Sequence, residues 1–236
     1  MLRAVVTCAV LAACEPRIPP RVLPELAQPQ PLVAIHVPML MFSPGETMSW
    51  SVTAKGFTLG RADLSVDQQV VHSRFETGKL VSAFARAHHE LQTTLGEGAP
   101  IGASELLDVD GEITHTDYEI RGPRYRANDK VGVVPNGNFG HTLHSALGTL
   151  RAWASPTARA GFLYVLHAGE VYRIDVAQPL VEELRGVSTL RVELRIHADE
   201  EIAISMWLRA SDRVPVRFEV GVGDAKVIAE LLATEA

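Results

Sequence analysis

The strongest constraint on the fold is the regular alternation of apolar and polar residues in the C-terminal third. Residues 190–196 alternate Leu, Val, Leu and Ile with Arg, Glu and Arg, and the same period returns over 202–208 and 214–220. A last strand is expected over 227–232. Successive side chains on a strand point to opposite faces, so each segment predicts a strand with one buried and one solvated face. Four such strands, joined by short polar turns, predict an antiparallel meander.

A second alternating segment lies near the start of the predicted domain. Residues 48–54 alternate Met, Trp, Val and Ala with Ser, Ser and Thr, a Lys55-Gly56 turn follows, and the alternation resumes over 62–66. This pattern predicts a β-hairpin with one wet face. Further strands with less defined bounds are expected between residues 74 and 134, where turn signals recur.

One segment, residues 139–154, has helical spacing instead. Asn138 is the expected N-cap, and Pro156 lies just past the end. A single amphipathic helix among many strands must pack its apolar stripe on a sheet. The sequence therefore predicts a mainly β fold, a curved antiparallel sheet or half-open β-barrel with one central amphipathic helix. The stripe consists of Phe139, Leu143, Ala146, Leu147, Leu150, Trp153 and Ala154.

The N-terminus has the parts of a bacterial lipoprotein signal. Met1-Leu2-Arg3 is a positive n-region, and residues 4–12 form an apolar run too short to span a bilayer as a helix. The run ends in Leu11-Ala12-Ala13-Cys14, which resembles the lipobox, in which the cysteine receives lipid. We therefore expect residues 1–13 to be cleaved as a lipoprotein signal peptide and Cys14 to be acylated.

The cysteine count agrees with lipidation. Cys8 lies in the predicted signal peptide, so Cys14 is the only thiol left in the mature chain. A lone cysteine in an exported protein raises the question of its partner, and acylation answers it. No internal disulfide is then possible, and the mature fold must be stable through its core alone.

Residues 14–44 predict a proline-rich tether. Such a stretch cannot form a helix or a central strand and favours extended conformations. Its second half contains the apolar segments 32–35 and 39–42, which we expect to lie against the domain formed by residues 45–236. Eight of the fourteen prolines fall in the tether, namely Pro16, Pro19, Pro20, Pro24, Pro29, Pro31, Pro38 and Pro44.

Three segments resemble the DUF3108 family of exported bacterial proteins. Residues 44–62 contain its opening Gly-Glu, strand, glycine turn and Gly-x-Ala, and residues 144–151 are similar to its central helix. Trp207-Leu208 followed by Asp212-Arg213-Val214-Pro215-Val216 resembles its closing hairpin. The resemblance covers residues 44–233 and implies an exported β-rich protein. It implies no activity and supplies no catalytic residues.

The histidines are the first candidates for chemistry. His141 and His144 lie one helical turn apart, off the apolar stripe, and His88-His89-Glu90 and His167 offer further donors. A metal site needs three or four converging ligands. On a strand, His88 and His89 point to opposite faces and cannot chelate together. We therefore interpret these histidines as solvated or hydrogen-bonded and predict no metal site.

Arg151 and Trp207 complete the candidate ligand-binding residues, together with His144. Arg151 lies on the flank of the predicted helix near His144, where it can pair with a sheet carboxylate or bind an anion. Trp207 faces away from Met206 and Leu208, so it either marks an outward contact patch or lies beneath the apolar segment 32–42.

Charge and motifs exclude several function classes. The net charge is -6 without a Lys/Arg cluster, so no nucleic-acid partner is expected. The carboxylate pairs Asp108/Asp110 and Asp199/Glu200 fall in turns, which favour Asp without catalysis. The sequence has no nucleophile elbow, phosphate-binding glycine loop or cysteine nucleophile. We therefore predict neither an enzyme nor a cofactor.

The sequence predicts a membrane-tethered cell-envelope lipoprotein that acts as a non-catalytic binding or assembly module. Its partners would be the membrane, through the lipid anchor, and an envelope protein or apolar ligand. It would face the periplasm, and Glu15 after the cysteine favours the outer over the inner membrane. Two alternatives stay open: a carrier of an apolar ligand in the concave face of the sheet, and a metal-binding protein or hydrolase using His141 and His144.

Overall fold

The alternating segments all lie in strands of one large sheet. The computed structural model describes residues 31–78, 82, 86–96, 98–198, 202–222 and 225–235. The predicted signal peptide, Cys14 and the first half of the predicted tether lie outside the described residues. Leu32–Ala236 form one compact unit. Within the described ranges, no helix combines the length and the hydropathy that a membrane crossing requires.

The described residues contain seventeen strands, one α-helix and one short 3-10 helix. In chain order they are β1 (Val33–Ala34), β2 (Thr47–Ala54), β3 (Phe57–Asp67), β4 (Val70–Thr77), β5 (Ala87–Leu95), β6 (Pro100–Val109), β7 (Glu112–Arg121), β8 (Arg124–Ala127), β9 (Lys130–Val133), η1 (Pro135–Gly137), β10 (Gly140–His141), α1 (Leu143–Trp153), β11 (Gly161–His167), β12 (Glu170–Val176), β13 (Leu180–Leu184), β14 (Val187–His197), β15 (Ile202–Arg209), β16 (Pro215–Val222) and β17 (Ala225–Glu235).

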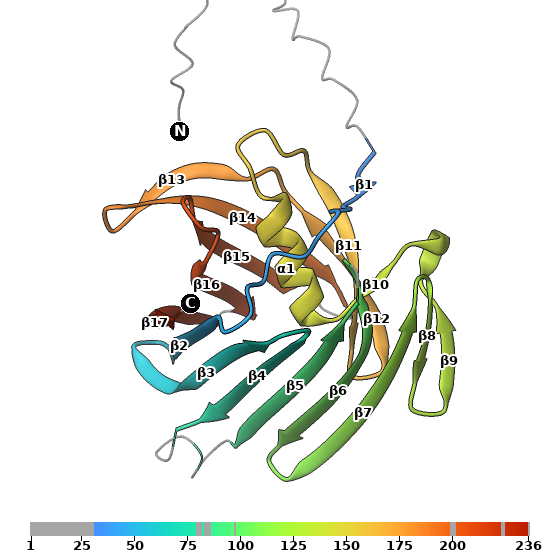
Figure 1. Cartoon of the computed structure of the whole chain (residues 1–236). Coiled ribbons are helices and arrows are strands. Elements are labelled where there is room, and N and C mark those ends of the chain that lie inside the picture. Colours follow the sequence, from blue (N-terminus) through green and yellow to red (C-terminus); the bar gives the residue numbers. More distant parts are fainter. Residues whose placement is uncertain are drawn as a thin grey trace, which may run out of the picture. The chain divides into compact units, whose positions relative to one another are not determined.

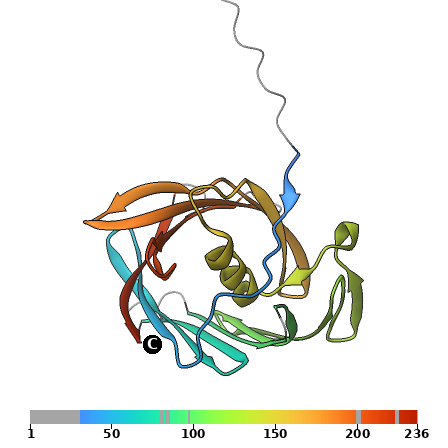
Figure 2. The same cartoon turned by 45° about the horizontal axis from the view of Figure 1, so that its top comes forward.

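The sheet curls around α1 without closing by hydrogen bonds (Figures 1 and 2). Its order begins with β1, β10 and β11, passes through β12 to β17, returns to β2, and continues to β9 at the other end. β1 and β10 pair in parallel with successive parts of β11, and the other pairings are antiparallel. The predicted half-open, curved antiparallel sheet with one central helix is therefore confirmed.

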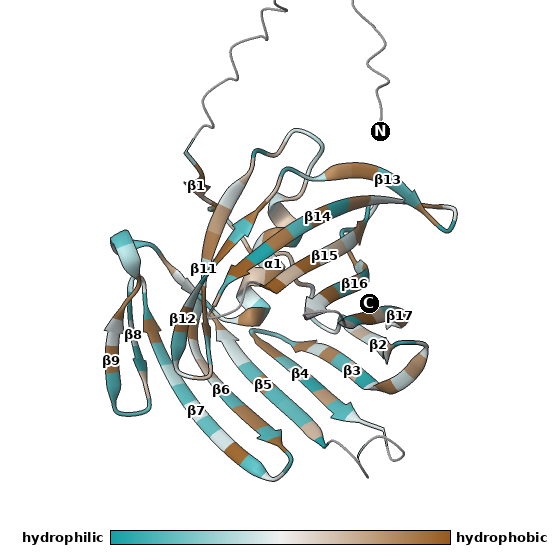
Figure 3. Ribbon diagram, turned by 180° about the vertical axis from the view of Figure 1, so that it is seen from behind, coloured by the Kyte–Doolittle hydropathy of each residue, from teal (hydrophilic) through white to brown (hydrophobic). Residues whose placement is uncertain are grey.

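The hairpin and the meander form as their alternation predicts. Met48, Trp50 and Val52 are buried on the inner side of β2. The residues of the Lys55-Gly56 turn both have positive φ, as a tight two-residue hairpin connection requires. Viewed from behind, β14 and β15 show alternating apolar and polar bands (Figure 3). The alternation of apolar and polar residues thus correctly predicted both the β2–β3 hairpin and the C-terminal meander.

The helix begins later than predicted. Its N-cap is Thr142, not Asn138: the Thr142 hydroxyl accepts a hydrogen bond from the Ser145 amide, and the Ser145 hydroxyl accepts one from the Thr142 amide. This reciprocal capping satisfies two of the amides that a helix start leaves unpaired. Gly140 and His141 pair with β11 instead, so Phe139 lies outside the helix and is half exposed.

The segment 32–42, called the strap below, crosses α1 within this unit (Figure 2). The Ile35 amide donates to the carbonyl of Phe162 at 2.9 Å, and the Met41 amide donates to the carbonyl of Gly148 at 3.1 Å. A Cβ on Gly148 would lie 2.6 Å from the ring of Phe42. Glycine at this helix position therefore lets the strap approach the backbone.

The core divides into two main clusters on the inner side of the sheet. One combines the apolar face of α1, including Ala146 and Leu150, with β11, β12, β14 and β15. The other combines Leu40 of the strap with apolar residues of β2, β3 and β4. Leu147 contacts both clusters. The helix and the strap thus occupy the concave face of this part of the sheet.

Candidate functional site

The polar face of α1 is buried, and of the two interpretations of His144, solvated or hydrogen-bonded, the structure shows the second. His144 Nδ1 lies 3.0 Å from the Thr93 hydroxyl, and its Nε2 lies 2.8 Å from the Ser73 hydroxyl. Burial lowers the pKa of His144 to about 3, and nearby His89 and His72 act in the same direction. His144 is therefore a neutral, hydrogen-bonded residue between the helix and β4–β5.

His141 lies on β10 and is also buried. Burial lowers its pKa to about 4, with a further effect from His36. Its Nδ1 has no hydrogen-bond partner among the described residues. In the part of the chain that the structure describes, neither His141 nor His144 belongs to a group of three metal-ligating side chains. Among these residues, the structure therefore gives no support to a metal centre built on this pair, and packing directs the two rings to separate surroundings.

Arg151 pairs with a carboxylate inside the fold. Its Nη1 and Nη2 donate to the Glu46 oxygens at 3.0 and 2.7 Å, and its Nε donates to the carbonyl of Arg213 at 3.1 Å. Both side chains of the ion pair are buried. All of these donors are directed at protein atoms, so the arrangement anchors the helix and leaves no evident place for an external anion.

Trp207 neither marks an exposed contact patch nor lies beneath the strap, the two positions that the sequence suggests. It is only 7% exposed, and its indole N–H donates to the carboxylate of Glu182 on β13. The guanidinium of Arg217 lies 5.6 Å from its ring centroid. Trp207 is thus covered by β13 and Arg217, not by the strap. His144 and Arg151 share one face of α1, whereas Trp207 faces away from the apolar core, so the three predicted ligand residues do not form one site.

The structure brings three other side chains together. His89 Nε2 and His167 Nδ1 lie 2.9 and 2.6 Å from the same oxygen of Glu105, Oε1. Glu105 is only 3% exposed, whereas the two histidines are partly accessible. We call these three residues the His–Glu cluster. Its members come from β5, β6 and β11, so it joins strands that lie near opposite ends of the sheet order.

The second oxygen of Glu105 is also occupied. Oε2 accepts hydrogen bonds from the Ala168 amide at 2.8 Å and from the Tyr118 hydroxyl at 3.1 Å. The Tyr118 oxygen accepts a hydrogen bond from the Gly169 amide at 2.7 Å. The turn between β11 and β12 is thereby held against β6 and β7, and the carboxylate orientation is determined by four donors.

These contacts set the charges of the cluster. Burial by itself would raise the pKa of Glu105, but the hydrogen bonds from His167 and His89 outweigh it and hold that pKa well below its usual range. The hydrogen bond to Glu105 raises the pKa of His167 against the opposing effect of burial. Burial raises the pKa of the Tyr118 hydroxyl. The cluster therefore holds an ionised carboxylate beside two imidazoles and a neutral phenol.

Sequence reasoning found two of the three members and missed the third. The sequence indicates both His89 and His167 as possible donors. His88 points to the other face of β5 from His89, as predicted, and pairs with Glu90 at 3.1 Å. Glu105 carries no motif, and β6 lacks the clean alternation that would have marked it as inward-facing. Glu105 could not be predicted because no local pattern in the sequence indicates that β6 and β11 meet across the opening of the sheet.

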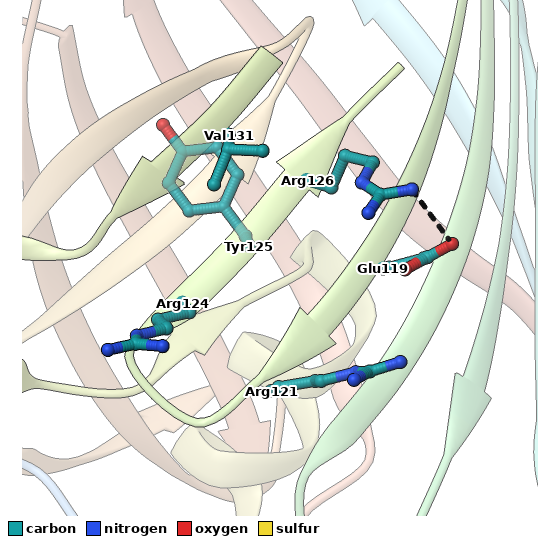
Figure 4. A pocket seen from close by; sticks show the side chains of 6 residues that line it. All are labelled: Glu119, Arg121, Arg124, Tyr125, Arg126 and Val131. Atoms are coloured by element: carbon teal, nitrogen blue, oxygen red, sulfur yellow. Dashed lines mark ion pairs between the residues drawn. The ribbon is translucent and has the colours of Figure 1, made fainter. Parts of the chain in front are cut away.

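A separate surface pocket of about 140 Å³ lies on β7, β8 and β9 (Figure 4). Arg126 and Glu119, a cross-strand pair, form an ion pair at 3.7 Å. Arg121 and Arg124 also lie opposite each other and are exposed, with no ion-pair partner among the described residues. The pocket is lined by Glu119, Arg121, Arg124, Tyr125, Arg126 and Val131.

The comparisons with known proteins define the fold. No family model matches the chain, and no curated protein matches it. Among solved structures, it is similar to a β-barrel-like protein of the domain of unknown function DUF1849 from Brucella abortus. The identity is 11%, the TM-score is 0.61, and the match covers 83% of this chain and 98% of the other. The chain thus has a β-barrel-like fold also found in a bacterial protein, and membership of DUF3108 is not shown.

A second solved structure, LprF from Mycobacterium bovis, matches with 15% identity over 82% of this chain and 87% of that one. Its TM-score is 0.27, which is too low to support an argument about fold or function.

Proposed function

We propose that this protein is a lipid-anchored module of the bacterial cell envelope that faces the periplasm and binds a partner without catalysis. The lipobox ending in Cys14 and the proline-rich residues that follow support the anchor. The motifs that resemble DUF3108 support an exported bacterial protein, and the β-barrel-like fold is also found in a bacterial protein. Glu15 supports placement at the outer membrane.

The observation that carries the binding role is the free edge of β9. Among the described residues, β9 pairs only with β8 and forms the end of the sheet. In the two-residue hairpin that joins β8 to β9, Gly132 and Tyr125 are opposite each other as a hydrogen-bonded pair. Because such pairs alternate with non-hydrogen-bonded ones, the backbone groups of Val131 and Val133 face away from β8. The Val131 side chain is 74% exposed. An open strand edge with exposed apolar residues is the feature to which an extended segment of a partner can add.

The charges beside this edge indicate the chemistry of the partner. Like charges directly opposite each other in a sheet are destabilising, as Arg121 and Arg124 are here. Carboxylates from a partner would relieve this repulsion, and guanidinium groups bind carboxylates well. We therefore propose an extended, acidic segment of an envelope protein as the partner of the β9 edge.

The alternative of an apolar ligand carried in the concave face has less support. The apolar face of α1 fills that space, with Leu150 buried and Leu147 and Trp153 packed against the core. Four pockets in the described residues, of about 140 to 570 Å³, contain no lining residue from α1. Binding through an outer edge is the better-supported mode.

The anchor is tested by expressing the full chain and its Cys14→Ser variant in a bacterial host. Mass spectrometry of the wild-type protein should show a diacylglycerol mass on the mature chain, and membrane fractionation should recover it with membranes. The variant should lack the lipid mass and appear in the soluble fraction. Unchanged membrane retention of the variant would contradict the anchor.

The β9 edge is tested by photo-crosslinking in cells, with a photoreactive residue placed at Val131 or, as a control, at Phe57. Both positions are highly exposed, but Phe57 begins β3, away from the end of the sheet. A discrete adduct is expected from position 131 and not from position 57. In the protein that carries the photoreactive residue at 131, a Val133→Pro change should abolish that adduct, because proline removes the outward-facing backbone donor of residue 133. Equal adducts from both positions would reject the edge as the binding surface.

A further inference from the structure

The His–Glu cluster has the composition of a metal-binding site. The ligand atoms of His89, Glu105 and His167 all lie within 4.8 Å of one another. Two imidazoles with one carboxylate favour first-row transition metals such as Zn²⁺, whereas Mg²⁺ and Ca²⁺ prefer oxygen ligands alone. Three protein ligands also leave a coordination position for water.

We propose that His89 Nε2, His167 Nδ1 and Glu105 Oε1 together bind one divalent transition-metal ion, with Zn²⁺ as the representative ion. The proposal goes beyond partner binding at β9 and does not depend on it. In the structure, the two imidazole N–H groups donate to Oε1. Metal binding would replace these protons, as it does whenever imidazole becomes a ligand.

The distances in the cluster fit such an exchange. The two N···O separations are 2.9 and 2.6 Å. Two ligand atoms at the usual distance of about 2.1 Å from a tetrahedral Zn²⁺ lie roughly 3.3 Å apart. Each imidazole nitrogen therefore needs to move away from Oε1 by less than an ångström. The partial exposure of both histidines gives an ion access from solvent.

Glu105 is already oriented as a one-oxygen ligand. Its Oε2 is held by the Ala168 amide and the Tyr118 hydroxyl, so Oε1 is the oxygen that faces the two imidazoles. Hydrogen bonds that orient a ligand in this way are usual features of metal sites, and their loss weakens metal affinity. Tyr118 is itself held by the Gly169 amide. Protein groups alone therefore hold Glu105 in the orientation that a metal ligand needs.

An ion in this position would also link distant parts of the sheet. His89 and Glu105 lie on neighbouring strands, whereas His167 ends β11 at the other side of the sheet opening. The ion would join these strands directly. Binding is therefore expected to raise the thermal unfolding temperature in addition to producing a calorimetric signal.

The test uses the full chain carrying Cys8→Ser and Cys14→Ser, so that no thiol competes for metal. Isothermal titration calorimetry with ZnCl₂ should show one site, and MgCl₂ should show none. In that background, His167→Ala and Glu105→Gln should each weaken Zn²⁺ binding by at least about 10-fold, and Tyr118→Phe by about 10-fold through the lost support. Co²⁺ absorption should show low-coordinate bands that decrease in the same variants.

The matched control is His88→Ala. His88 neighbours His89 on the same strand but pairs with Glu90 on the opposite face, so its loss should leave Zn²⁺ affinity unchanged. Circular dichroism establishes that each compared variant is folded, and Tyr118→Phe serves if the Glu105 or His167 change prevents folding. Absence of Zn²⁺ binding by the folded parent would overturn the proposal. So would equal Zn²⁺ affinity in the parent and in folded His167→Ala.

Discussion

Arg151 and Glu46 form a bidentate ion pair that connects the last turn of α1 to the residue before β2. The two contacts measure 3.0 and 2.7 Å, and the side chains are only 3% and 8% exposed. Arg151 also lies 5.5 Å from the ring centroid of Phe42 in the strap. Helix, strap and sheet therefore meet at one charged contact, where neither charge can be solvated if its partner is lost.

Removing one partner of this pair should be costly. Arg151→Ala leaves the Glu46 carboxylate buried without its guanidinium, and the free energy of unfolding should fall by about 3–5 kcal/mol in urea denaturation. Arg185→Ala is the matched control, because Arg185 is 71% exposed and its ion pair with Glu230 is worth about 0–1 kcal/mol. Similar losses in the two variants would show that the buried pair has no special role.

Replacing both partners distinguishes charge burial from simple loss of packing. In Arg151→Met/Glu46→Leu no uncompensated charge stays inside, so the double variant should recover most of the stability lost in Arg151→Ala. The measurement is the same urea denaturation, analysed as a double-mutant cycle. A double variant as unstable as the single one would attribute the loss to packing and to the hydrogen bond with Arg213.

The crossing of the strap over α1 depends on Gly148. A leucine at this position would collide with Phe42 and with Leu40, which lie 2.6 and 3.2 Å from the position of its Cβ. Gly148→Leu should therefore destabilise the protein by about 1–3 kcal/mol despite its better helix propensity. Limited proteolysis should detect cleavage within 39–42. Ala152→Leu, on the exposed side of the same helix, should be neutral or stabilising.

The N-cap of α1 offers a third test of local structure. Thr142 caps the Ser145 amide and also accepts a hydrogen bond from Thr93 at 3.0 Å. Thr142→Ala should lower the thermal unfolding temperature, with a loss of about 1–2 kcal/mol. Thr157→Ala removes an exposed hydroxyl beyond the helix and should change stability by less than about 0.5 kcal/mol. If the helix started at residue 139 as its spacing suggests, the two changes would have similar effects.

Stability should fall in mild acid because of His144. Burial lowers its pKa in the folded state to about 3 from the ordinary 6.5, so the unfolded chain binds the proton first as pH falls below 6.5. This histidine therefore costs up to about 1.4 kcal/mol per pH unit between pH 6.5 and its folded pKa. His144→Gln should reduce the slope of the thermal unfolding temperature between pH 7 and 5, where the shifted Glu105 does not yet titrate. An unchanged slope would place the acid sensitivity in other groups.

Much of the fold follows from local patterns in the sequence. Alternation identified β2, β3 and the strands from β14 to β17, because a period of two matches a strand with one buried face. The helical period identified α1, because side chains three or four residues apart lie on the same face of a helix. These patterns depend on near neighbours in the chain, and the fold class follows from their order.

Pairing between distant residues was decided only by the tertiary structure. The sequence leaves open whether the polar side of α1 is solvated, and it is buried because Glu46, Ser73 and Thr93 supply hydrogen-bond partners. Glu105 joins His89 and His167 because β6 and β11 meet across the sheet opening, which no local pattern records. The sequence by itself determined the fold class, the β2–β3 hairpin, the strands β14 to β17, the presence of one central helix and the residue expected to be the lipid anchor. The curvature of the sheet decided which polar residues meet, because that depends on contacts between residues far apart in the chain.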